Sequence, residues 1–221
     1  MIAETLKIDI EAFGHRMLQS ALMRRARDGE LPGTAVATYL SSILYLIRHT
    51  PVYLDLARER AAALGEHDLA RYFASKIREE AGHDQWAQND VASVERSFDV
   101  AAPSAPLPSI AALVAYLRRT IEDDPERYLA YILFAEHFTV LTGPQWLAAM
   151  ESRCGVPASS MTVIAHHVEL DQRHVAEGLA EIDELVRDPA RLGPLRDTLH
   201  ASMRFFTGFC DELAELGQRP T

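Results

Sequence analysis

Hydrophobic residues recur at helical spacing along almost the whole chain, and this periodicity restricts the chain to a helical fold. In the first segment Ile10, Phe13, Met17 and Ala21 follow one another in steps of three and four residues. No strand-like alternation of apolar and polar residues continues for more than a few positions. We therefore expect an all-α fold, in which residues 1–221 form a single domain, one bundle of seven to eight helices.

Proline and glycine residues mark the expected ends of the helices. Pro51 is expected to kink or restart the apolar helix before it, and Gly143-Pro144 to end a helix. The three prolines of residues 98–109 make this segment the clearest predicted loop. The expected helices include 34–49, 67–96, 126–141, a helix from Ser159 or Ser160 to Val186, and 195–216.

Composition limits the partners and the compartment. The 221 residues carry a net charge of -10, which argues against nucleic acid and anionic membranes as partners. The N-terminus does not resemble a signal peptide, and no segment has the ~18 uninterrupted apolar residues of a membrane span. Two cysteines, Cys154 and Cys210, favour free thiols in a reducing compartment. We expect a cytoplasmic protein.

The strongest motif lies in the segment AHHVELDQRHVAEG. His167, Asp171 and His174 are spaced at i, i+4 and i+7, so they lie within about 60° of one helix face. His166 points about 100° away from this stripe. Apolar residues flank the stripe, which predicts that it borders the core, where unpaired imidazoles and carboxylates are costly. A solvent-exposed polar face is the alternative, and a metal site is the favoured interpretation.

A second motif, IREEAGHDQW, places Glu80 and His83 at i, i+3. On one helix face, this Glu-x-x-His unit offers a carboxylate and an imidazole to one metal ion. Alone it is a weak signal, because a surface pair gives the same pattern. Glu79 is an alternative ligand to Glu80. Gly82 is costly inside a helix and indicates a close helix approach or room for a metal or substrate.

A third element is Glu136, within the apolar segment YLAYILFAEHF. A carboxylate among these aromatic and aliphatic residues is expected to be buried. The alternative to a metal ligand is a buried glutamate paired with an arginine.

The three motifs together supply three imidazoles and three carboxylates. This mixture suits iron or manganese better than zinc, and two metal ions would use all six groups. Their order along the chain differs from that of ferritin-like diiron proteins. The six candidate ligands are Glu80, His83, Glu136, His167, Asp171 and His174.

With these motifs in this order, the sequence resembles the heme-oxygenase-like diiron oxidases, often named iron-containing redox enzymes and related to TenA and PqqC. The resemblance implies a seven-helix bundle, often dimeric, with two non-heme irons, of which one can be weakly bound. It also implies an oxygenase or oxidase that uses dioxygen on a small organic substrate such as an amino acid or fatty acid. N-oxygenation and oxidative carbon–carbon cleavage are the expected outcomes.

Other classes of protein remain as alternatives at this point. They are a metal-free TenA- or PqqC-like enzyme, a heme oxygenase, and a non-catalytic metal- or ligand-binding protein. Neither cysteine has the motif of a reactive thiol, and no nucleophile is assigned. Candidate residues of the substrate pocket are His49, Tyr53, Trp86 and Tyr131, although such residues more often belong to the packed core.

Overall fold

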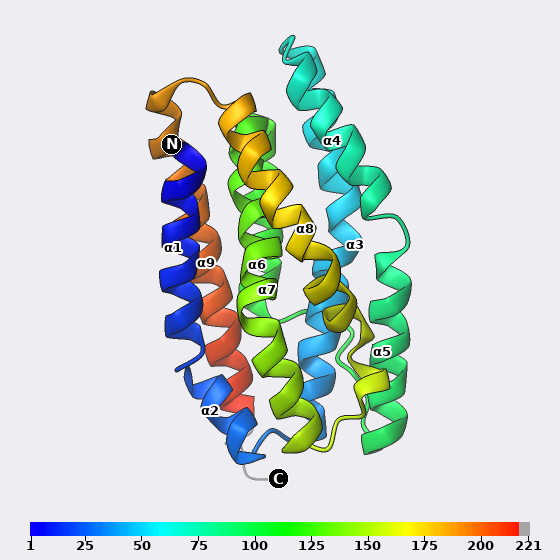
Figure 1. Cartoon of the computed structure of the whole chain (residues 1–221). Helices are drawn as coiled ribbons and strands as arrows, with labels where there is room; N and C mark the ends of the chain where they lie inside the picture. Colours follow the sequence, from blue (N-terminus) through cyan, green and yellow to red (C-terminus); the bar gives the residue numbers. More distant parts are fainter. Residues whose placement is uncertain (217–221) are drawn as a thin grey trace.

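The computed structural model describes residues 1–216, and within this part every regular element is helical. The all-α prediction is therefore confirmed, while residues 217–221 of the predicted 1–221 domain lie outside the described residues. The helices run roughly side by side along one direction (Figure 1). Their bounds are α1 Ile2–Met17, α2 Ala21–Asp28, α3 Gly33–Ala63, α4 His67–Glu79, α5 His83–Phe98, α6 Pro108–Asp123, α7 Tyr128–Ser152, α8 Thr162–Leu185 and α9 Leu192–Leu216.

Two groups of helices face each other across the middle of the bundle. The helix α3 has 31 residues, and both α4 and α5 pack against it, one after the other along its length (Figure 1). On the other side α7 and α8 pack along each other, and α9 packs against α6 and α7. The candidate metal ligands described below come from α5, α7, α8 and the turn between α4 and α5.

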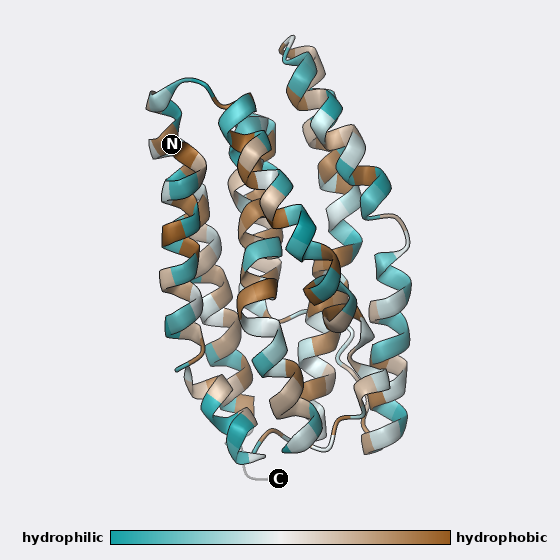
Figure 2. Ribbon diagram, viewed as in Figure 1, coloured by the Kyte–Doolittle hydropathy of each residue, from teal (hydrophilic) through white to brown (hydrophobic). Residues whose placement is uncertain are grey.

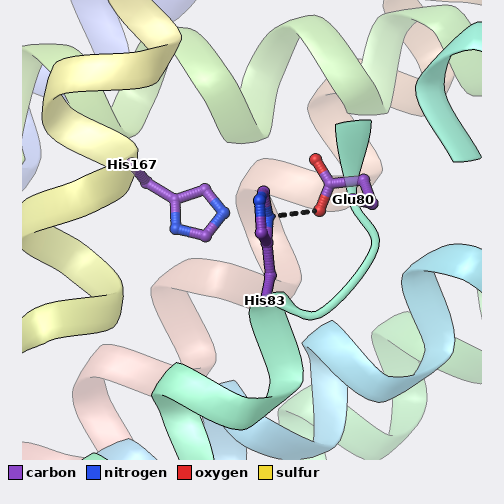
Figure 3. Close-up of side chains that lie close together, drawn as sticks. All are labelled: Glu80, His83 and His167. Carbon is purple, nitrogen blue, oxygen red and sulfur yellow. Dashed lines mark hydrogen bonds and ion pairs between the residues drawn. The ribbon is translucent and has the colours of Figure 1, made fainter. Parts of the chain in front are cut away.

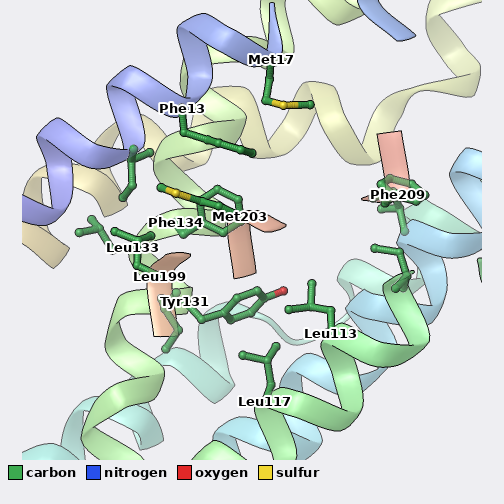
Figure 4. Close-up of a cluster of buried hydrophobic side chains, with 14 of the residues drawn as sticks. Phe13, Met17, Leu113, Leu117, Tyr131, Leu133, Phe134, Leu199, Met203 and Phe209 are labelled. Carbon is green, nitrogen blue, oxygen red and sulfur yellow. The ribbon is translucent and has the colours of Figure 1, made fainter. Parts of the chain in front are cut away.

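The core consists of apolar side chains from helices that are far apart in the sequence. Phe13 of α1 packs edge-on against Phe134 of α7, with ring centroids 5.7 Å apart (Figure 4). Met203 and Phe209 of α9 and Leu117 of α6 are buried in the same cluster. Hydrophobic and hydrophilic residues share each helix rather than occupying separate ones (Figure 2), and none of the helices in residues 1–216 is long and apolar enough to cross a membrane.

The predicted helix 67–96 is wrong, because the chain breaks it into α4 and α5. Gly82 has φ +88°, a left-handed conformation that glycine adopts without steric cost and that cannot continue a right-handed helix. A Cβ at this position would meet nothing within 4 Å, so the backbone conformation, rather than a close helix approach, accounts for the glycine. Glu80 and His83 consequently lie on either side of a turn and not on one helix face.

The prediction that Gly143-Pro144 ends a helix is also wrong, since α7 continues to Ser152. Gly143 is buried, and a Cβ there would lie 2.4 Å from Cγ2 of Val168, so the glycine permits close packing of α7 on α8. Trp146 and Met150 beyond it are buried, and this burial offsets the hydrogen bond that Pro144 cannot donate. In the same way, α3 continues through Pro51 without a restart.

The start of α8 is fixed by a side chain from a different helix. Asp90 of α5 is fully buried, and its carboxylate accepts hydrogen bonds from the backbone N–H of Val163 at 2.8 Å and the hydroxyl of Thr162 at 2.7 Å. A carboxylate at this end satisfies one of the free N–H groups and interacts favourably with the helix dipole. The pairing positions α8 relative to α5, and these two helices carry His167 and His83.

We predict that Asp90→Ala lowers the free energy of unfolding by about 2 kcal/mol, because it removes the cap and leaves buried donors without partners. Urea denaturation followed by circular dichroism measures this change. The control is Asn89→Ala on the exposed face of α5, for which the change should stay within about 0.5 kcal/mol. Equal effects of the two substitutions would contradict the capping role.

Candidate metal centre

The six residues predicted as metal ligands lie together in two sets of three. In each set, one ligand atom per residue can be chosen so that all three atoms lie within 4.8 Å of one another. Metal–ligand bonds of ~2.0–2.2 Å require only small side-chain movements from such an arrangement. The first set is Glu80, His83 and His167, and the second set is Glu136, Asp171 and His174.

The first set is assembled by the turn around Gly82 and by α8. Glu80 follows the last residue of α4, His83 is the first residue of α5, and His167 reaches toward both from α8 (Figure 3). Nδ1 of His83 lies 3.1 Å from Oε2 of Glu80. Burial alone would raise the pKa of Glu80, but the hydrogen bond with His83 and the surrounding positive groups, Lys76 among them, outweigh it and lower this pKa. Glu80 is therefore an ionised carboxylate.

Each imidazole of the first set is held by a neighbour. Nδ1 of His167 lies 2.7 Å from the carbonyl oxygen of Val163, which can only accept, so Nδ1 carries the proton and Nε2 is free to bind a metal. Burial lowers the pKa of His167, which keeps the ring neutral. The ring of His83 stacks on Trp86 with centroids 4.5 Å apart, and meets His167 edge-on at 4.8 Å.

The second set is more deeply buried. Glu136 of α7 is 7% exposed, and Asp171 and His174 of α8 are 3% and 4% exposed. Nδ1 of His174 lies 3.2 Å from Oδ1 of Asp171 and 4.0 Å from Oε1 of Glu136. Burial raises the pKa of Asp171 to about 8 and that of Glu136 to about 7, with the neighbouring carboxylates adding to both shifts. Burial also lowers the pKa of His174.

The sequence interpretation missed Lys76, whose side chain lies against this second set. Its Nζ lies 3.0 Å from Oε1 of Glu136 and 3.1 Å from Oε2 of Glu79. The predicted alternative for Glu136, a buried ion pair, thus occurs with a lysine rather than an arginine. The sequence did contain a signal that Lys76 is buried. Lys76 lies on the same helical stripe as Leu69 and Tyr72, where the pattern calls for an apolar residue.

A cavity of about 210 Å³ connects the two sets. Glu80 and His167 of the first set and Glu136 and Asp171 of the second line it. The rest of its wall is mostly aliphatic and aromatic and comes from α1, α2, α3, α6, α7, α8 and α9, with no lysine or arginine among its lining residues in the described chain. The lining includes Leu22, Tyr39, Ile43, Leu113, Tyr131, Phe134, Thr139, Trp146, Phe206 and Cys210.

Of the four residues predicted for the pocket, Tyr131 lines this cavity and the other three do not. Nδ1 of His49 bonds the carbonyl oxygen of Tyr45 at 2.8 Å, and the hydroxyl of Tyr53 donates to the carbonyl oxygen of Val114 at 3.1 Å. Trp86 instead supports the ring of His83.

The donor atoms of both sets are those that iron and manganese accept. The first set offers two imidazoles and one carboxylate, and the second offers one imidazole and two carboxylates. Oε2 of Glu136 is buried and forms no hydrogen bond with any described residue, so one oxygen remains available for a metal ion. Neutral imidazoles and free carboxylate oxygens are the forms in which these side chains bind metals.

Comparison with known proteins places the fold but not an activity. Neither a family model nor a curated protein matches the chain. Among solved structures, a domain of unknown function from Shewanella denitrificans, described as having a heme oxygenase-like fold, matches with a TM-score of 0.85 and 21% identity. The match covers 97% of this chain and 93% of that one.

Two further structures have the same architecture. A CADD-like protein of unknown function from Nostoc punctiforme matches with a TM-score of 0.75 and 14% identity over 97% of this chain and 98% of that one. A TenA homolog from Pseudomonas syringae pv. tomato matches with a TM-score of 0.73 and 20% identity over 97% of this chain and 93% of that one. The chain therefore has a heme oxygenase-like fold, in which its two sets of candidate ligands lie along one apolar cavity.

Proposed function

We propose that this protein is a non-heme iron oxidoreductase that uses two iron ions and dioxygen to oxidise a small organic substrate. The observation that carries the proposal is that both ligand sets border one cavity. Glu80 and His167 contribute from the first set and Glu136 and Asp171 from the second. A substrate in this cavity would lie beside both metal positions.

Bound Fe(II) supplies electrons to dioxygen and open coordination positions for the reactants. The chain contributes positioning and the exclusion of water. Val163 and Trp86 hold the rings of His167 and His83, and Glu136 keeps a free carboxylate oxygen. The apolar wall keeps bulk water away from the reacting groups.

The cavity wall supports a substrate with an apolar body. Because no lysine or arginine is among the described lining residues, a substrate carboxylate would find its cation only at the metal positions. The aliphatic and aromatic lining favours hydrocarbon groups over additional charges. Among the substrate classes considered from the sequence, this favours fatty acids and amino acids with apolar side chains.

Specific observations speak against the other two enzyme classes. Cys210 is a lining residue that a TenA-like nucleophilic mechanism could use, but burial raises its pKa far above the ordinary value, and the thiolate is therefore disfavoured. A heme oxygenase carries its heme-ligating histidine on the first helix, and His15, the histidine of α1, is exposed. The cavity is also smaller than the roughly 300–1,000 Å³ of typical sites for drug-sized ligands.

The test is to add Fe(II) to the protein without oxygen and then supply air with medium-chain fatty acids or apolar amino acids. We expect about two irons per chain and oxygen consumption that depends on both iron and substrate, measured with an oxygen electrode and by mass spectrometry of products. Iron uptake without oxygen-dependent product would favour the non-catalytic binding protein. A Soret band after addition of hemin would favour a heme protein, and either result would contradict the proposal.

We predict that His174→Ala reduces the iron content toward one per chain and lowers oxygen-dependent turnover by on the order of 100-fold or more, because it removes a ligand of the second set. Helicity measured by circular dichroism should not change. His166→Ala is the control, since this side chain packs on Trp86 and belongs to neither set. Loss of iron from His166→Ala together with normal iron in His167→Ala would contradict the ligand assignment.

A second substitution tests the cavity without touching a ligand. Thr139 of α7 lines the cavity, so Thr139→Phe is expected to fill part of it. We predict normal iron content and a KM for the substrate raised about tenfold or more, as loss of one or two good apolar contacts would cause. Ala148→Phe on the exposed face of α7 should leave both quantities unchanged. A normal KM in Thr139→Phe would mean that substrate binds elsewhere.

A further inference from the structure

Lys76 is one of only two lysines in the chain, and it is almost completely buried. Its side chain extends from α4 to α7, where Nζ lies 3.0 Å from Oε1 of Glu136. Lysine is rarely buried to 4% exposure unless an anion compensates its charge. Two carboxylates do so here, Glu136 and, three residues further along α4, Glu79.

The ammonium group of Lys76 makes its direct contacts beside the second ligand set, and it acts on Glu80 of the first set only through its charge, without a direct contact. The two carboxylate oxygens that it contacts also flank the ring of His174, at 4.0 Å for Oε1 of Glu136 and 3.8 Å for Oε2 of Glu79. Within residues 1–216 the first set has no such cation. The ion-pair partner of Glu80 there is His83, itself a member of the set.

This asymmetry bears directly on metal binding. A lysine ammonium is a compact point charge, and it already supplies the electrostatic compensation that a metal ion would bring to the carboxylates. A metal bound to Glu136 at ~2 Å would lie only a few ångströms from Nζ, in an environment where like charges repel strongly. In residues 1–216 no lysine or arginine contacts a ligand of the first set, so a metal there meets less repulsion.

We propose that Lys76 is a built-in competitor for the second metal ion. The chain then loads its metals in order, tightly at Glu80, His83 and His167 and weakly at Glu136, Asp171 and His174. This inference rests on the proposed function, because it takes both sets as metal sites. Glu79 is half-buried at the end of α4 and gives the ammonium a partner when a metal takes Glu136.

The experiment measures Mn(II) binding to the full chain, with bound metal counted by equilibrium dialysis and elemental analysis. For the unchanged chain we expect one tight site and a second site weaker by on the order of 100-fold, from the repulsion between the two cations. In Lys76→Met the second site should tighten to within about tenfold of the first. The melting temperature of this variant should also rise more on addition of Mn(II), since its buried carboxylates have lost their resident cation.

Lys7→Met is the matched control, because Lys7 is the other lysine and pairs with Glu11 on the surface of α1. It should bind metal as the unchanged chain does. If Lys76→Met does not fold, Lys76→Gln removes the charge while keeping a donor for Glu136, and the same tightening is expected. Two equally tight sites in the unchanged chain, or unaltered binding in the neutral variants, would overturn the role of Lys76.

A last variant separates failure of this inference from failure of the proposed function. Glu80→Gln should abolish the tight site whether or not Lys76 competes at the other set. If Glu80→Gln loses the tight metal and the neutral Lys76 variants bind like the unchanged chain, the metal centre stands and the competition is wrong. If the unchanged chain binds no Mn(II) or Fe(II), both proposals are wrong.

Discussion

The interaction between Lys76 and Glu136 is the constraint around which the centre of this bundle is organised. A buried ammonium and a buried carboxylate each carry a large desolvation cost, which only a close partner offsets. Their contact at 3.0 Å joins α4 to α7 across the interior. With the end of α4 fixed in this way, the turn at Gly82 brings Glu80 and His83 to the same side of the bundle as α8.

A second constraint is the close packing of α7 on α8. Gly143 has no side chain to separate these helices, and Val168 occupies the space where a Cβ would lie. Seven residues earlier on α7, Glu136 faces Asp171 and His174 of α8, so the second set is formed between two helices in direct contact. The first set is formed by three segments and a backbone turn. Its geometry therefore depends also on the conformation of that turn.

The cavity gives these two sets a common environment. Four of the six candidate ligands border it, and its other walls are largely aliphatic and aromatic. Such an enclosure lowers the local dielectric, which strengthens each electrostatic interaction inside it and makes an uncompensated charge expensive. The same property explains the raised pKa of Asp171 and the presence of Lys76. The proposed chemistry and the buried ion pair are two consequences of one apolar interior.

The sequence by itself determined the all-helical fold and the helical phase of His167, Asp171 and His174. Both follow from local spacing, because an α-helix repeats every 3.6 residues whatever lies next to it. Burial of Glu136 was also predictable from its apolar neighbours in the sequence.

Only the tertiary structure decided how the six residues divide into two sets. His167 and His174 share a stripe but lie two turns apart, about 10 Å along the axis, so each meets different helices. The sequence could not show that Gly82 forms a left-handed turn, because a glycine in a helical segment can have several other roles. The partner of Lys76 is 60 residues away, at Glu136. Spacing along one helix cannot specify these features, because they depend on distances between segments that are remote in the chain and on the need to compensate charge where they meet.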